Sequence, residues 1–90
     1  MSYTYYENWR RESLKRLNEA KESLESIRSL MEKSGVDEIE IERKIEVISQ
    51  LISHSEGLHK RYKYPDALKK SREARELLKE LRYLVLASKE

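Results

Sequence analysis

The stretch from Val36 to Tyr62 constrains the fold of this chain more than any other. Seven of its residues recur at alternating steps of four and three, a spacing that places them on one line along an α-helix. The line consists of Ile41, Ile45, Ile48, Ile52, Ser55, His59 and Tyr62. Val47, Leu51 and Leu58 broaden it into a face too wide for one partner. The stretch therefore predicts a helix over about residues 37–61 that packs against two others.

The segment before it carries a second helical stripe. Thr4 followed three residues later by Glu7 matches a capping box, which predicts a helix beginning near Tyr5 and running over about residues 5–33. The residues at helical spacing are Tyr6, Trp9, Ser13, Leu17, Ala20, Leu24, Ile27 and Met31. This segment supplies one of the two partners.

A short reversal is expected between these helices. Gly35 suits the left-handed position that ends a helix, and Val36 would then contact Met31. Asp37 with Glu40 three residues later forms another capping box. Val36 and Ile41 would add a hydrophobic staple to this start. The combination predicts a tight antiparallel turn.

The third helix is expected over about residues 65–88. Pro65 fits the first helical position, and it pushes Tyr64 out of helical geometry. The apolar and small residues at steps of four and three are Ala67, Ser71, Ala74, Leu78, Leu81 and Val85.

The residues alone do not fix the end of the second helix, because Gly57 costs about 1 kcal/mol relative to Ala within a helix. The second helix either continues through Gly57, kinks or ends there.

These three segments predict an all-α, antiparallel, up-down-up three-helix bundle, with residues 1–90 forming a single domain. Layers counted from the Gly35 turn are first branched and aliphatic. They then become small and polar at the same height in all three stripes, and aromatic residues follow. The polar layer would contain Ser13, Ser55, His59 and Ser71.

Composition excludes several classes of protein. The chain has no cysteine, so it forms no disulfide and has no thiolate for a metal or a nucleophile. No apolar run is long enough for a membrane span, and the first residues do not resemble a signal peptide. We therefore expect a cytoplasmic protein without membrane partners. The high content of charged residues, 40%, also suits a thermophile.

The net charge of +2 is unevenly distributed. Residues 1–16 and 58–75 together carry eleven basic and four acidic side chains, and the bundle places both segments at its aromatic end. Basic charge neutralises phosphates and aromatic faces stack on unpaired bases, so this end is a candidate nucleic-acid surface. Its residues are Arg10, Arg11, Lys15, Lys60, Arg61, Lys63, Lys69, Lys70, Tyr6, Trp9, Tyr62 and Tyr64. Alternatively, the rings simply close the end of the bundle within a solvated rim of charges.

The aliphatic end has more apolar residues than three stripes can bury. Such a surplus is typical of a surface for a protein partner or for self-association, although scattered exposed apolar residues are also normal. The candidate partner surface consists of Leu30, Ile39, Val47, Tyr83, Leu84 and Leu86.

No pattern predicts catalysis, a cofactor or a metal site. Glu56 and His59 have the Glu-x-x-His spacing of di-iron bundles, but those proteins need two copies and further carboxylates. No Ser-His-Asp set or glycine-rich phosphate loop is present. We therefore expect a non-enzymatic interaction module that contacts a protein partner or forms a homodimer. The alternatives are a nucleic-acid-binding protein and a small-ligand carrier that uses the polar layer under its tyrosines.

Overall fold

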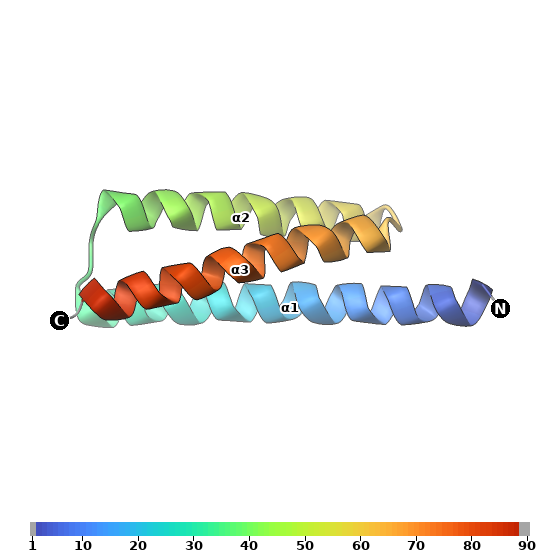
Figure 1. Ribbon diagram of the computed structural model, residues 1–90, viewed down its shortest axis with the longest axis horizontal. Coiled ribbons are helices and arrows are strands. Elements are labelled where there is room, and N and C mark those ends of the chain that lie inside the picture. Colours follow the sequence, from blue (N-terminus) through green and yellow to red (C-terminus); the bar gives the residue numbers. More distant parts are fainter. Residues whose placement is uncertain (1, 89–90) are drawn as a thin grey trace.

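The computed structural model of the protein describes residues 2–88, which form three helices packed against each other (Figure 1). They are α1 (Ser2–Ser34), α2 (Ile39–Lys60) and α3 (Tyr64–Ser88), and the described residues contain no strand. The helices run up, down and up, so the predicted all-α three-helix bundle is confirmed. The bundle is elongated, with principal extents of 53 × 16 × 16 Å.

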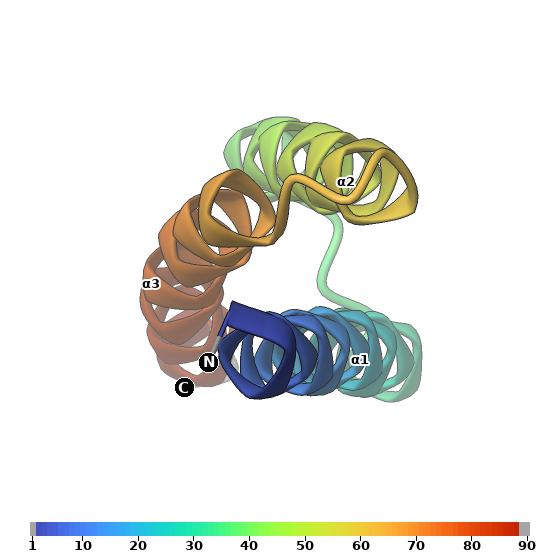
Figure 2. The ribbon, with the colours of Figure 1, turned by 90° about the vertical axis from the view of Figure 1, so that its right-hand side faces the viewer.

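The helix shared by the other two is α3. It packs along both α1 and α2, whereas α1 and α2 touch each other least, as the end-on view in Figure 2 shows. The sequence pattern had given this central place to α2. Three small residues of α3, Ala67, Ser71 and Ala74, are at most 2% exposed. Their size lets both neighbours approach the α3 backbone closely, which explains the difference.

The core follows the predicted stripes. Its largest completely buried apolar side chains are Ile27, Ile41, Ile48, Leu81 and Val85, all in the half nearest the Gly35 turn. Each such side chain stabilises the fold by about 1.5–3 kcal/mol. Ile45 is only half-buried, since it faces the less intimate contact between α1 and α2.

The connection between α1 and α2 is longer than expected. Gly35 has a positive φ of 69°, and the Val36 N–H donates to the Met31 carbonyl at 3.3 Å. This is the hydrogen bond of a Schellman motif, so the predicted end of α1 is confirmed. The prediction that Asp37 caps α2 is wrong. Glu38 is the N-cap residue, in an extended conformation and without a side-chain cap hydrogen bond, because the Schellman motif already uses Val36.

The predicted staple is also out of register. Val36 packs half-buried on the core, but with Glu38 as the cap the residue before it is Asp37. Glu40 and Glu42 instead lie in the first turn of α2, where their negative charges interact favourably with the positive end of the helix dipole.

Two other helix starts differ from the prediction. α1 begins at Ser2, so Thr4 lies inside the helix and is not its cap. α3 begins at Tyr64, one residue before Pro65. Pro65 still lies in the first turn, where its missing N–H has no helical partner to lose.

The link between α2 and α3 has an unusual residue at its centre. α2 continues through Gly57 to Lys60, and Tyr62 then takes a left-handed conformation with φ of 65°. The Tyr62 N–H donates to the His59 carbonyl at 3.0 Å, and the Lys63 N–H donates to the Leu58 carbonyl at 2.9 Å. These two bonds define a Schellman motif whose left-handed position usually holds glycine. A side chain there costs roughly 1–2 kcal/mol.

Replacing Tyr62 by glycine should therefore raise the free energy of unfolding, by roughly 0.5–1 kcal/mol. Tyr83 is the matched control, because it is 74% exposed against 70% for Tyr62 but lies within right-handed helix. Tyr83→Gly should lower the free energy of unfolding by about 1 kcal/mol. Denaturant unfolding of both variants checks this. Equal destabilisation by the two substitutions would contradict the left-handed strain at Tyr62.

Candidate functional site

Tyr64 is the centre of an aromatic cluster at the end of the bundle that carries the α2–α3 link. The residue is 3% exposed, and its ring lies 5.1 Å from the ring of Tyr6 on α1 and 5.1 Å from that of His59 on α2. The Tyr62 ring packs edge-to-face on it at 6.4 Å. Aromatic pairs of this kind contribute about 0.5–1.5 kcal/mol each beyond burial. The cluster ties all three helices together at this end.

The polar layer lies directly beneath this cluster. The Ser13 hydroxyl and His59 Nδ1 are hydrogen-bonded at 2.8 Å, which joins α1 to α2. The Ser55 hydroxyl donates to the Ala67 carbonyl at 2.8 Å, and the Ser71 hydroxyl donates to the Leu68 carbonyl at 3.0 Å.

All three serines of this layer are at most 2% exposed. Their hydroxyls are therefore committed to bonds within the bundle, which argues against a role in holding a ligand. The geometry of the Ser13–His59 pair is also unlike that of a catalytic dyad. Ser13 is buried beyond reach of a substrate, and the Glu56 carboxylate contacts Lys21 rather than orienting the imidazole.

Burial and charge alter two ionisation equilibria in this region. Burial, with a contribution from the nearby positive charge of Arg10, lowers the pKa of His59 below its ordinary value. A hydrogen bond with Tyr6, followed by desolvation, raises the pKa of Tyr64 to about 12. Both shifts favour the uncharged forms of His59 and Tyr64.

The positive charges of the candidate nucleic-acid surface fall into two groups. Arg10 pairs with Glu7 at 3.1 Å, and Lys70 pairs with Glu73 at 3.6 Å. The other six are exposed and form no ion pair within the described residues. They are Arg11, Lys15, Lys60, Arg61, Lys63 and Lys69.

The four aromatic residues of that surface also differ from one another. Tyr62 and Tyr6 are exposed, 70% and 42%, and Trp9 is half-buried and stacked on Tyr5 at 6.0 Å. Tyr64 is buried, so its ring is a structural support and cannot stack on a base. The candidate surface is thus reduced to the exposed rings and the unpaired cations around them.

A groove between α1 and α3 adds basic residues that were missing from the predicted surface. It encloses about 400 Å³ over Trp9 and Leu68, and its cationic lining consists of Arg16, Arg72, Arg75 and Lys79. Three of these, at positions 72, 75 and 79, are spaced three and four residues apart, so the sequence could have predicted that they share one face of the helix. Arg16, Arg75 and Lys79 lie within 4 Å of glutamates, so most of this charge is already balanced.

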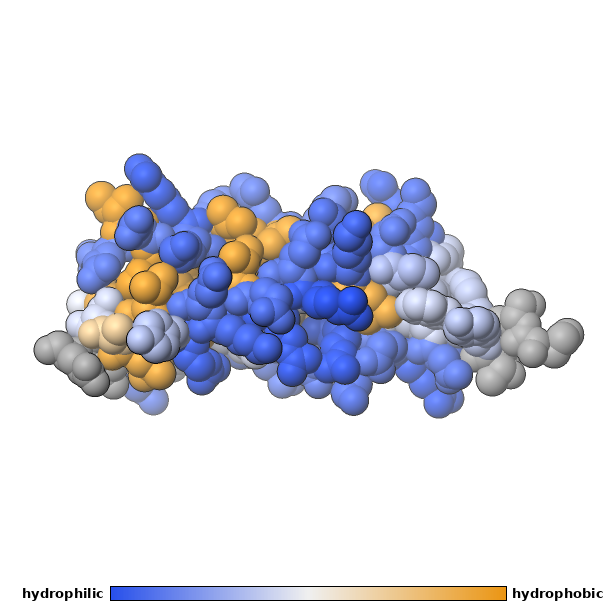
Figure 3. Space-filling view, viewed as in Figure 1, coloured by the Kyte–Doolittle hydropathy of each residue, from blue (hydrophilic) through white to orange (hydrophobic). Residues whose placement is uncertain are grey.

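Apolar surface gathers at the opposite end of the molecule. Figure 3 shows hydrophobic residues concentrated toward the Gly35 turn and the C-terminal part of α3. Ile39 is 70% exposed and Tyr83 is 74% exposed, and Val47, Leu84 and Leu86 are also exposed. Of the predicted partner surface, only Leu30 is half-buried, since it packs against the core.

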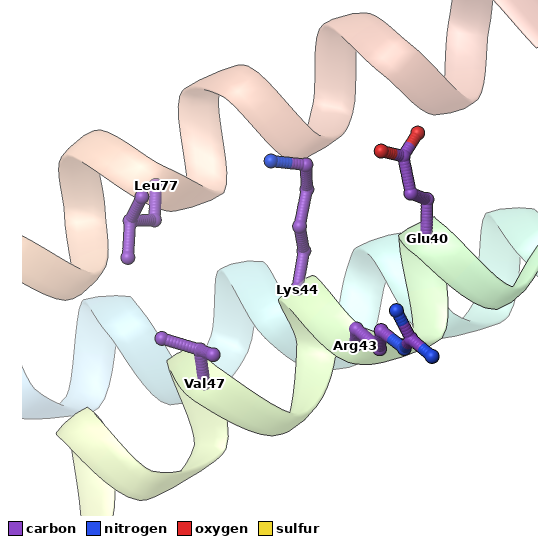
Figure 4. Close-up of a pocket in the computed structure, with 5 residues that line it drawn as sticks. All are labelled: Glu40, Arg43, Lys44, Val47 and Leu77. Atoms are coloured by element: carbon purple, nitrogen blue, oxygen red, sulfur yellow. The ribbon is translucent and has the colours of Figure 1, made fainter.

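The seam between α2 and α3 forms a groove with a partly apolar lining. A cavity of about 310 Å³ is lined by Glu40, Arg43, Lys44, Val47 and Leu77 (Figure 4). Val47 from α2 and Leu77 from α3 form its apolar wall. Sequence spacing did not identify this groove, because Leu77 lies beside the line of buried residues on α3 and not on that line.

The other two seams are bridged by polar side chains. Lys21 pairs with Glu56, and Arg28 donates to Ser49 at 3.1 Å, across α1 and α2. Arg75 lies 3.9 Å from Glu19 across α1 and α3. Within residues 2–88 no ion pair links α2 to α3. Across the α2–α3 seam the buried Ser55 hydroxyl bonds the Ala67 carbonyl, while no ion pair covers the outer groove between Val47 and Leu77 within these residues.

No protein-family model, curated protein or solved structure matches this chain. Over the residues described, none of the three helices combines the length and apolarity needed to cross a membrane. The same residues contain no group of three or more His, Cys, Asp or Glu side chains placed to hold a metal ion.

The lowered pKa of half-buried His59 predicts a pH dependence of stability. Its pKa is lower in the folded than in the unfolded chain, so the unfolded chain binds more protons below about pH 6.5. This contribution to stability is present above pH 6.5 and is lost as the pH falls through the folded pKa. The difference in unfolding free energy between the wild type and His59→Gln should therefore shrink between pH 8 and pH 5.

His54 provides the matched control, because it is an exposed histidine on the same helix. The His54→Gln variant should keep the wild-type profile when both are unfolded in denaturant at each pH. A His59→Gln profile parallel to the wild type would show that His59 is not held neutral.

Proposed function

We propose that this protein is a non-enzymatic helical interaction module that associates with a second copy of itself through the α2–α3 seam. The supporting observation is that this seam places exposed Val47 and half-buried Leu77 at a cavity and, within residues 2–88, lacks the ion pairs that cross the other two seams. Exposed apolar surface that is contiguous and rimmed by charge is typical of an interface.

The charges along the seam favour a second copy as the occupant. The charged residues that line the α2 side are Glu40, Arg43 and Lys44. On α3, Glu73 and Glu80 lie four residues before and three residues after Leu77, so they share its face of the helix. The α2 side therefore carries one net positive charge, and on α3 Glu80 is negative while Glu73 already pairs with Lys70. A two-fold axis along the seam places the α2 side of each copy over the α3 side of the other, and so Lys44 near Glu80.

The register of such a pair follows from the cavity. Val47 on α2 and Leu77 on α3 lie at the same height along the bundle. Because the two helices are antiparallel, Lys44 and Glu80 are level with each other one helical turn closer to Gly35. One helical turn further on, Glu40 is level with Leu84. In the two-fold pair Lys44 of one copy faces Glu80 of the other. The seam is only two helices wide, which is at the small end of specific interfaces. We therefore expect association in the micromolar range or weaker.

Sedimentation equilibrium from micromolar to millimolar concentration tests the proposal. The wild type should pass from monomer to dimer, and Val47→Lys and Leu84→Lys should remain monomeric with unchanged helical circular dichroism. Leu14→Lys is the control, because Leu14 is a comparably exposed leucine, at 39%, on α1. It should dimerise like the wild type.

A charge exchange tests the two-fold arrangement itself. Lys44→Glu and Glu80→Lys should each weaken the dimer, and the double variant should restore it, since both contacts are then reversed together. A wild type that stays monomeric at all concentrations would overturn self-association. A dimer that survives Val47→Lys and Leu84→Lys would place the interface elsewhere.

A further inference from the structure

Tyr62 occupies a position that its surroundings do not explain. Its left-handed φ of 65° favours glycine, and both hydrogen bonds of the turn are made by backbone atoms. The residue is 70% exposed, so burial repays little of the conformational cost. Costly backbone conformations of this kind gather where a protein binds ligands. The ring is held at the outer end of the bundle by its edge-to-face contact with buried Tyr64.

Unbalanced positive charge surrounds this ring. Lys60, Arg61 and Lys63 are its nearest neighbours in the chain; all three are exposed, and none forms an ion pair within the described residues. The link therefore presents one aromatic side chain among three cations within four residues. This arrangement differs from the α1–α3 groove, where glutamates balance most of the arginines.

The N-terminal part of α1 lies at the same end of the molecule (Figures 1 and 2). It adds Tyr6, which packs on Tyr64 and is 42% exposed, and Tyr5, which is 64% exposed and stacks on Trp9. Arg11 and Lys15 contribute two more exposed cations from this helix. The link is thus the centre of a larger surface of the same chemistry.

We propose that this end of the bundle binds single-stranded nucleic acid, with Tyr62 stacking on an unpaired base and Lys60, Arg61 and Lys63 neutralising the phosphates beside it. A basic patch alone would attract any polyanion, whereas an exposed ring among the cations additionally suits a polyanion with accessible base faces. A duplex hides those faces within its stack. An anionic bilayer would favour aliphatic side chains to insert, and the segment from Lys60 to Lys63 has none.

Fluorescence anisotropy with a labelled single-stranded oligo(dT) of about 12 nucleotides at low salt tests the proposal. Tyr62→Gly should weaken binding roughly 5- to 150-fold, the range found when a stacking ring is removed. Tyr62→Phe should bind as the wild type does, because it keeps the stacking face. Tyr83→Ala, at an equally exposed tyrosine on another part of the bundle, should also leave binding unchanged.

The salt dependence separates phosphate contacts from other effects. Each phosphate contact to a single strand contributes about 0.7 to the slope of log K against log salt concentration. The double variant Lys60→Gln/Lys63→Gln should therefore make the slope shallower by about 1.4. Lys33→Gln, at the Gly35 end, should leave the slope unchanged.

The monomeric Val47→Lys variant should bind oligo(dT) like the wild type, so this proposal and self-association can fail independently.

Two results would overturn the proposal. One is no detectable binding of oligo(dT) at low salt. The other is binding that is insensitive to Tyr62→Gly and equally tight for duplex DNA, heparin and phosphatidylserine vesicles, since this would show a surface that recognises negative charge alone.

Discussion

Close packing of α3 against both other helices is the constraint on which the rest of the structure depends. Ala67, Ser71 and Ala74 make it possible, because their small side chains leave room for α1 on one side and α2 on the other. This packing brings the two basic segments of the chain to one end of the bundle. It also leaves the α1–α2 contact loose enough to need polar bridges such as Lys21 with Glu56.

Periodicity predicted the buried residues well, since burial of a helical face depends on spacing that the sequence shows directly. It also predicted that Ser13 and His59 share a layer, because three stripes change character at one height. The N-terminal caps were predicted poorly, although the end of α1 at Gly35 was confirmed. A cap contributes only about 1 kcal/mol, so the path of the chain overrides it, as at Asp37. Nothing in the sequence predicted the left-handed conformation of Tyr62, because tyrosine rarely adopts a positive φ.

The two candidate surfaces depend on features that sequence spacing cannot supply. Whether Val47 is covered depends on the side chains that reach across each seam, and these are known only once the helices are placed. Tyr64 and Tyr62 look alike in sequence, yet one supports the bundle and the other is exposed. The surfaces lie on different parts of the α2–α3 hairpin, so a second copy and a nucleic acid would not compete for the same residues.

The meeting of three helices at Tyr64 is the feature that fixes the register of the whole bundle. Its most direct test is a nuclear Overhauser spectrum of the assigned protein. The account predicts cross-peaks from the Tyr64 ring protons to those of both Tyr6 and His59, whose ring centres each lie 5.1 Å away. A Tyr64 ring with cross-peaks to His59 but none to any residue of α1 would contradict it.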